Sequence, residues 1–145
     1  MEEALIYLTI SRPDIQTAVS FGATHSAKPT RGDFEELKYL EATPEEGLVL
    51  KAGEPNRELV LKFYVDASYL THSDSKSHQG YCLSFGEIGT FYSKSSKQQL
   101  VSTSSTQSDV RALQSLVVDI IFIVELCKEL GRSIKLPVIV FEDNE

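Results

Sequence analysis

The stretch Leu59–Asp66, which reads Leu-Val-Leu-Lys-Phe-Tyr-Val-Asp, decides the fold class. Every odd-numbered residue in it is large and apolar, whereas the residues between them include a lysine and an aspartate. A period of two is typical of a β-strand that buries one face and leaves the other accessible. The stretch therefore predicts a half-buried strand, and its last residue, Asp66, is expected at the edge of the sheet.

Two more strands are expected downstream. Residues 81–85 alternate in the same way, Glu87-Ile88-Gly89 indicates a hairpin turn, and residues 90–93 are expected to form the third strand. The segment therefore predicts an antiparallel meander of three strands.

A helix and a last strand follow the meander. From Thr106 to Leu130 apolar residues recur at helical spacing, which predicts one helix, or two if the pattern breaks near Val118-Asp119. Gly131 is suited to end that helix. Leu136–Phe141 is apolar and predicts a buried strand. Strands followed by a helix and a further strand indicate an α/β fold.

The first fifty residues show a different pattern. Ser11-Arg12-Pro13-Asp14 predicts the start of a helix, and a second helix is expected to end at Thr43-Pro44. Residues 47–50 suggest a short strand. We therefore expect a helical segment over residues 1–50, a linker over residues 51–57 and the sheet domain over residues 58–145.

Composition places the chain among globular proteins. It has 145 residues, of which 41% are hydrophobic, and no apolar run reaches the roughly 18 residues that span a bilayer. The cysteines, Cys82 and Cys127, form neither a disulfide framework nor a zinc motif, so we expect buried free thiols and an intracellular location. His72 and His78 lie in a polar stretch, where solvated side chains are expected and a metal site is the alternative.

The charge is acidic and unevenly distributed. The formal net charge is −7, with 6 basic and 11 acidic residues in 1–60 and 8 basic and 10 acidic residues in 61–145. Nucleic-acid binding needs clustered lysine and arginine, so this balance argues against a dedicated nucleic-acid binder. The second half is close to neutral, and some of its acids are candidate metal ligands.

Three acids occupy informative positions. Asp66 ends the first strand of the sheet domain, Asp109 lies in the expected first turn of the long helix, and Asp143 follows the last strand. If the first and fourth strands are neighbours, the two strand-end carboxylates lie side by side, and the helix can bring the third. Clustered carboxylates repel one another unless a cation such as Mg²⁺ compensates. Each acid also has an ordinary structural explanation, since Asp109 suits a helix start and Asp143 a turn.

An ordered series of short motifs resembles the Pol polyprotein of copia-type LTR retrotransposons, from the end of the reverse transcriptase into ribonuclease H. The motifs run through nearly the whole chain in the family's order. They are residues 7–15 (YLTISRPDI), 37–40 (LKYL), 64–69 (YVDASY), 75–81 (SKSHQGY), 92–99 (YSKSSKQQ), 104–113 (SSTQSDVRAL) and 142–144 (EDN).

The resemblance implies a ribonuclease H-like mixed sheet, with three antiparallel strands, a helix and a parallel strand, preceded by a segment like the thumb and connection. It implies hydrolysis of the RNA strand of an RNA–DNA hybrid with Mg²⁺ or Mn²⁺, and with two such ions if the site is intact. Asp66, Asp109 and Asp143 would be the catalytic metal ligands. The rest of a reverse transcriptase polyprotein would be a partner, and the cytoplasm, a virus-like particle or the nucleus the location. Lys94, Lys97 and Gln98 would line the hybrid-binding surface, or else form an ordinary solvated loop.

The sequence departs from the family pattern in three ways. The family has glutamate where this chain has Asp109, and acids where it has Gln107 and Ser68. The family's fifth strand, last helix and fourth carboxylate lie beyond residue 145. An alternative is therefore a catalytically inactive or domesticated remnant that binds nucleic acid or a protein.

Overall fold

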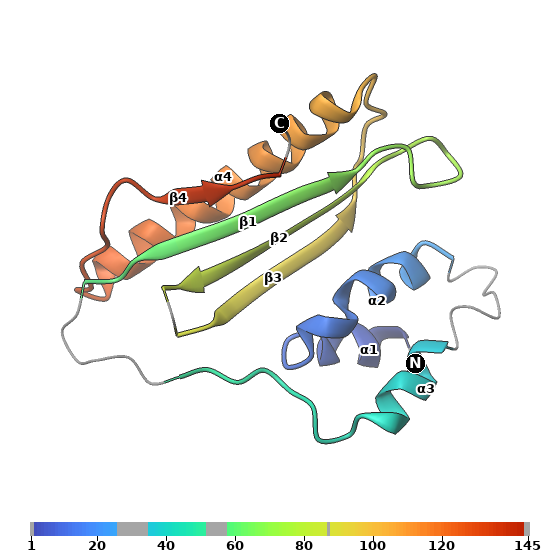
Figure 1. The fold of residues 1–145 in the computed structure, drawn as a ribbon, viewed down its shortest axis with the longest axis horizontal. Coiled ribbons are helices and arrows are strands. Elements are labelled where there is room, and N and C mark those ends of the chain that lie inside the picture. Colours follow the sequence, from blue (N-terminus) through green and yellow to red (C-terminus); the bar gives the residue numbers. More distant parts are fainter. Residues whose placement is uncertain (1, 26–34, 52–57, 87, 144–145) are drawn as a thin grey trace.

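The computed structural model describes residues 2–25, 35–51, 58–86 and 88–143. A four-stranded sheet carries one long helix on one face. The shorter N-terminal helices lie near the edge strand β3 (Figure 1). The α/β class with a mixed sheet is thus confirmed. The expected linker falls, apart from Lys51, outside the described residues.

The sheet has the strand order β3-β2-β1-β4. Strands β1, β2 and β3 pair antiparallel, as expected of the meander, and β4 pairs parallel with β1. The first and last strands are therefore neighbours. Their bounds are β1 Leu61–Ser68, β2 His78–Phe85, β3 Thr90–Lys97 and β4 Ile139–Phe141.

The alternation in β1 separates the two faces of the sheet. Leu61, Phe63 and Val65 are buried beneath helix α4 (Ser105–Glu129), whereas Tyr64 and Asp66 are exposed on the opposite face. Apolar residues of α4 and β2 complete this core, which is why the helix lies flat along β1 and β2.

Helix α4 runs through 25 residues without the break considered near residue 118. The Ser104 hydroxyl accepts a hydrogen bond from the Gln107 backbone N–H and caps its start. Because the helix begins at Ser105, Asp109 lies at the start of its second turn. The prediction that Asp109 lies in the first turn is therefore wrong. Among the described residues, no helix is long and apolar enough to cross a membrane.

Two strand predictions need correction. Strand β3 continues to Lys97, well beyond the predicted residue 93, because its polar residues still pair with β2. Strand β4 has only three residues and all are exposed, so the predicted buried strand over Leu136–Phe141 is wrong. Strand β4 is an edge strand that pairs only with β1, so its other edge is open and its residues keep part of their surface exposed to solvent.

The N-terminal helices form a separate layer against β3. Arg12 is buried between them: its guanidinium donates to the Asp14 carboxylate and to the backbone carbonyl of Thr43. The predicted strand at residues 47–50 is wrong, because this segment forms no ladder and Leu48 donates singly to the Ser11 carbonyl. The helices are α1 Glu2–Leu8, the 3-10 turn Pro13–Ile15, α2 Gln16–Ala23 and α3 Glu35–Ala42.

Candidate active site

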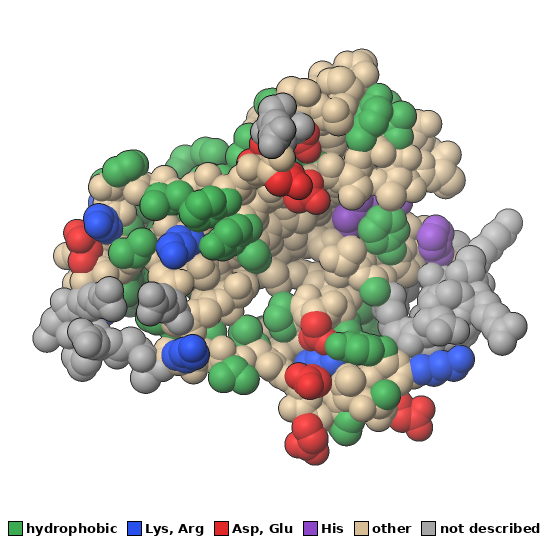
Figure 2. All heavy atoms as spheres, viewed as in Figure 1, with side chains coloured by type: hydrophobic (Ala, Val, Ile, Leu, Met, Phe, Trp, Pro, Cys, Tyr) green, Lys and Arg blue, Asp and Glu red, His purple; other side chains and the backbone are tan. Residues whose placement is uncertain are grey.

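An open hollow of about 570 Å³ lies on the face of the sheet opposite α4, between β1, β4 and helix α2. Acidic side chains gather at one rim of the hollow, and histidine lies to their right in the same view (Figure 2). The polar side chains on its lining are Gln16, Thr17, Asp66, Ser68, His78, Ser93, Lys94, Ser95, Glu142 and Asp143. We call this hollow the acid pocket.

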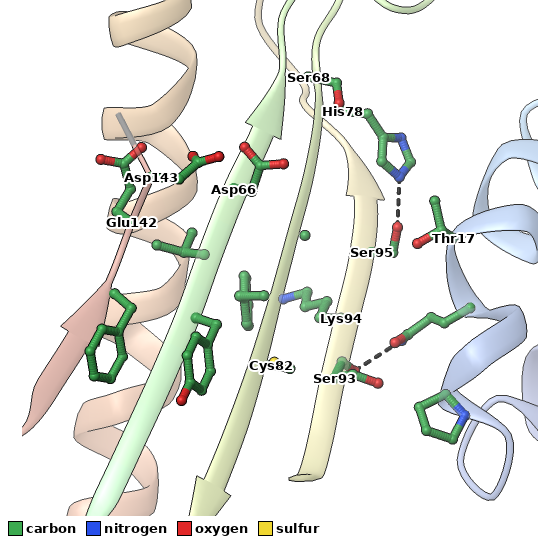
Figure 3. Close-up of a pocket in the computed structure, with 17 residues that line it drawn as sticks. Thr17, Asp66, Ser68, His78, Cys82, Ser93, Lys94, Ser95, Glu142 and Asp143 are labelled. Carbon is green, nitrogen blue, oxygen red and sulfur yellow. Dashed lines mark hydrogen bonds between the residues drawn. The ribbon is translucent and has the colours of Figure 1, made fainter. Parts of the chain in front are cut away.

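Two of the three predicted carboxylates meet in the acid pocket. Parallel pairing sets Lys62 beside Ile139 and Tyr64 beside Phe141, so Asp66 and Asp143 each follow the last paired position by two residues. Both side chains are exposed and line the pocket, where their carboxylates lie at the same end of the two strands (Figure 3). Neighbouring carboxylates repel one another, so this end of the sheet is suited to a cation.

Glu142 adds a third carboxylate to the pocket lining. It directly follows β4, next to Asp143, and we did not single it out from the sequence as a site residue. Its place after a strand was the available signal, but the period of two put it on the face away from Asp143. Because β4 ends at Phe141, that alternation no longer governs Glu142.

Asp109 is not brought to the acid pocket. It is 7% exposed, lies on α4 and is not among the pocket-lining residues. Among the described residues, no group of three histidine, cysteine, aspartate or glutamate side chains is close enough to hold a metal ion. The prediction that Asp66 ends its strand is wrong, because β1 continues to Ser68 through its pairing with β2. The structure offers Asp66 within β1 and Asp143 just after β4, with Glu142 nearby, and keeps the helix carboxylate in the interior.

The wall opposite the acids is neutral and hydroxyl-rich. Ser93 and Ser95 on β3 and Thr17 on α2 face the hollow (Figure 3). The Gln16 side chain donates to the Ser93 carbonyl at 2.9 Å and attaches α2 to the edge of the sheet. The N-terminal segment thus builds one side of the pocket.

A chain of hydrogen bonds leads from the interior to this wall. Nε2 of His72 lies 2.9 Å from Nδ1 of His78, and Nε2 of His78 lies 2.7 Å from the Ser95 hydroxyl. The ring of Phe21, from α2, stacks on both imidazoles at centroid distances of 4.8 and 4.1 Å. The chain fixes the position of the Ser95 side chain at the pocket surface.

The expectation of solvated histidines is wrong. His72 is 8% exposed and His78 is 5% exposed, because the loop after β1 folds back over β2 and α2 covers both rings. Burial, and then the neighbouring His72, lower the pKa of His78 to about 4. Both rings are therefore neutral near pH 7, since the pKa of His72 is also lowered, chiefly by burial.

The predicted nucleic-acid-binding residues lie in three different settings. The Lys94 ammonium is 3.9 Å from Asp119 of α4, toward the face that the helix covers, and the Lys97 ammonium is 2.9 Å from Asp74. Gln98 is 4% exposed, and its amide donates to the Ser108 carbonyl and accepts from the Ser102 hydroxyl. These contacts give Gln98 a role in positioning the start of α4.

The two cysteines are free thiols. Cys127 is buried, as expected, whereas Cys82 is half-buried and lines the acid pocket. Burial raises the pKa of both thiols. Both are thus held in the protonated, weakly nucleophilic form at neutral pH.

Comparison with known proteins relates the chain to transposon polyproteins. It is 32% identical over 146 residues to "Retrovirus-related Pol polyprotein from transposon RE2" and 33% identical over 146 residues to "Retrovirus-related Pol polyprotein from transposon RE1", both of Arabidopsis thaliana. These matches cover 97% of this chain and 10% of each polyprotein, so the chain spans about a tenth of their length.

An uncharacterized mitochondrial protein of the same plant is 35% identical over 116 residues, which is 76% of this chain and 46% of that protein. No protein-family model and no solved structure matches the chain.

Proposed function

Because the chain is homologous to a segment of the Pol polyproteins of copia-type transposons, we propose that it is a ribonuclease H-like domain that hydrolyses the RNA strand of RNA–DNA hybrids. One observation carries the proposal: Asp66 and Asp143 lie at the same end of the neighbouring parallel strands β1 and β4 and line one pocket (Figure 3). Adjacent carboxylates in an open pocket are the donors that a hard divalent cation prefers.

In this proposal Asp66 and Asp143 hold Mg²⁺ or Mn²⁺ through their carboxylate oxygens. A bound divalent ion supplies an activated water and neutralises charge at the phosphate. The protein's own contribution is to hold Asp66 on β1 and Asp143 two residues after β4, since a site built on strands keeps its geometry better than one built on loops. Glu142, at the rim, adds a further negative charge that favours cation binding.

Asp109 remains the proposed third ligand, although it has to act from a buried position. Its carboxylate would have to leave the interior and reach from the α4 side of the sheet to the opposite face, where the acid pocket lies. Lys97 is one proposed contact to the hybrid, because it lies at the end of β3 on the pocket face. Lys94, paired with Asp119, is the second, and Gln98 would act indirectly by holding the start of α4.

The test is cleavage of an end-labelled RNA–DNA hybrid by the 145-residue chain in Mg²⁺ and in Mn²⁺. We expect cleavage by the wild type and a loss of about a hundredfold or more in Asp66→Asn and Asp143→Asn. Glu125→Gln, an exposed carboxylate on α4, is the matched control and should cleave normally. Circular dichroism confirms that each variant is folded. Folded wild-type protein that leaves the hybrid intact would contradict the proposal.

A second candidate function is a non-catalytic binding module, and the burial of Asp109 favours it. Without a third ligand the site binds metal less tightly, and the chain would then contribute only contacts within a polyprotein. In that case Asp66→Asn leaves hybrid or protein binding unchanged, and no divalent ion affects it. Metal-dependent cleavage that is lost in Asp66→Asn would eliminate this second candidate.

As part of a transposon polyprotein, the chain would work beside the remaining Pol domains. The N-terminal helices fit such an arrangement, because α2 packs on β3 and forms one wall of the acid pocket. The location that follows from this proposal is inside the cell, in the cytoplasm, a virus-like particle or the nucleus.

A further inference from the structure

The register of the sheet places three residues in one row across the acid pocket. Asp66 of β1 pairs with Gly80 of β2, and Gly80 pairs with Ser95 of β3. All three line the pocket. Since neighbouring strands are about 4.8 Å apart, Asp66 and Ser95 stand about 10 Å apart with a residue that has no side chain between them. The backbone of Gly80 is therefore the floor of the acid pocket between the Asp66 carboxylate and the Ser95 hydroxyl.

The backbone does not require a glycine at position 80. Gly80 is absent from the positive-φ glycines, which are Gly86, Gly89 and Gly131. A Cβ built on Gly80 would meet the Lys94 carbonyl oxygen at 3.7 Å, which is an ordinary contact. A glycine inside a strand weakens it relative to alanine. Neither conformation nor packing of the chain therefore accounts for this residue.

Close approach of a ligand does account for it. A glycine inside a strand is often found where a ligand or another backbone lies directly on the sheet. On one side of Gly80 stands Asp66, the proposed metal ligand, and on the other stands Ser95, held by His78. A ligand lying on Gly80 would touch both of its neighbours in the row.

We propose that the sugar–phosphate backbone of the RNA strand lies on Gly80 and accepts or donates a hydrogen bond at the Ser95 hydroxyl. This inference rests on the proposed function and adds the residues that seat the substrate. A serine hydroxyl suits this ligand, because hydroxyls contact phosphate and sugar oxygens without reading the bases. Ser95 is also neutral, so it adds no charge opposite the acids.

His78 and His72 act in this arrangement as positioning residues. The Nε2 atom of His78 fixes the Ser95 hydroxyl, and His72 fixes His78 through Nδ1. The stacked ring of Phe21 keeps the pair in place and away from water. Ser95 therefore needs no reorientation when the strand binds.

The test is equilibrium binding of a short fluorescent RNA–DNA hybrid, measured by anisotropy without divalent ion so that cleavage plays no part. We expect Gly80→Ala to weaken binding at least tenfold while its melting temperature stays equal to or above that of the wild type. Gly47→Ala is the matched control, since its Cβ meets only the Ser11 carbonyl at 3.9 Å and lies outside the acid pocket. Wild-type affinity in Gly80→Ala would overturn the inference.

Two serines of β3 provide a second matched pair. Ser95→Ala should weaken binding about tenfold, which corresponds to one lost hydrogen bond. Ser96→Ala, one residue along and on the face toward α4, should bind as the wild type does, since Ser96 pairs with Gln79. Equal binding by both variants would remove Ser95 from the site.

The positioning role is tested by combining variants. His78→Phe keeps an aromatic ring against Phe21 but has no Nε2, so it should weaken binding as Ser95→Ala does. The double variant should then bind no more weakly than Ser95→Ala alone, because both changes remove one interaction. Additive losses would contradict the positioning role, because they would show that His78 affects binding independently of Ser95.

The outcomes separate this inference from the proposed function. A wild type that cleaves the hybrid, together with a Gly80→Ala variant that binds and cleaves equally well, overturns the inference alone. A folded wild type that neither binds nor cleaves the hybrid overturns both. Asp66→Asn should lose cleavage but keep binding without divalent ion, since it removes a negative charge near the strand.

Discussion

Nδ1 of His78 lies 2.9 Å from Nε2 of His72, and both imidazoles are shielded from solvent beneath Phe21. A hydrogen bond between two ring nitrogens needs one donor and one acceptor, so at least one ring of the pair is neutral. Protonating both rings would set two positive charges together in a place with little water. The pair therefore connects the packing of α2 on the sheet to pH.

Stability should fall as the pH is lowered from 6.5 to about 4. The fold lowers the pKa of His78 from 6.5 to about 4, mainly by burial, so in this window the unfolded chain binds more protons and unfolding becomes easier. The contribution, up to about 3 kcal/mol, is complete above pH 6.5 and lost near pH 4. The pKa of His72 is also lowered by burial and by the positive charges of Lys97 and His25, whereas the negative charge of Asp74 raises it. Urea unfolding followed by circular dichroism measures the change.

His78→Phe is the control for this pH dependence, because it removes the titrating group and keeps the stacked ring. Its stability should vary less between pH 6.5 and 4 than that of the wild type. The carboxyls of Asp14 and Asp74 do not confuse the result, since hydrogen bonds from Arg12 and Lys97 hold their pKa values below 3.8. An unchanged slope in His78→Phe would show that other groups cause the dependence.

Divalent metal should raise the melting temperature of the wild type. An ion that binds only the folded chain stabilises it by mass action, by about 2.7 kcal/mol at a hundred times its dissociation constant. Differential scanning fluorimetry in Mn²⁺ and in EDTA measures the shift, and Asp66→Asn and Asp143→Asn should abolish it. Asp109→Asn shows whether the buried carboxylate joins the site: a reduced shift means that it does. An equal shift in all four proteins would mean that the ion binds elsewhere.

The hydroxyl of Tyr81 should contribute measurably to stability. Tyr81 is buried in β2 and donates to the Asp119 carboxylate of α4 at 2.6 Å, and burial followed by that bond raises the pKa of the phenol. We expect Tyr81→Phe to lower the free energy of unfolding by about 1–2 kcal/mol, as for a hydrogen bond to a charged group that is partly solvated. Tyr92→Phe is the control, since its 3.4 Å contact to Asp119 is long and exposed. Equal effects of both changes in urea unfolding would contradict this prediction.

Leu116 should be among the costliest side chains to shorten. It is 0% exposed where α4 crosses the sheet, so Leu116→Ala leaves a cavity and should cost about 2–5 kcal/mol. Leu126, on the same helix, is 41% exposed, and Leu126→Ala should cost under about 1 kcal/mol. Chemical denaturation of the two variants gives the comparison. A small effect at Leu116 would mean that the helix moves in to fill the space.

The sequence predicts those parts of the fold that repeat a simple period. Strand β1 and helix α4 show apolar residues at spacings of two and of three to four, and both formed nearly within the expected bounds. Strand β4 was misjudged, because an apolar run does not reveal whether a strand has one neighbour or two. The polar end of β3 was missed for a related reason: its pairing with β2 makes it a strand, and its own composition does not.

The site shows the same division. The approach of Asp66 and Asp143 followed from strand order, since only the neighbour relation of β1 and β4 was needed. The His72–His78 pair could not be foreseen, because its burial depends on Phe21, which is distant in sequence. Gly80 carried no signal as a residue type, and its meaning appears only with the register that sets it between Asp66 and Ser95.

The irregularity between Leu83 and Ser84 bears on how this hairpin can evolve. There the pairing passes from Tyr92 to Thr90, so one residue of β3 is accommodated between the turn and the pocket. A bulge at this point takes up extra length locally. Loops that gain or lose residues at the β2–β3 turn can thus be tolerated without sliding Ser95 past Gly80. Changes of sequence or length at the tip of the hairpin therefore leave the pairing of Asp66, Gly80 and Ser95 unchanged.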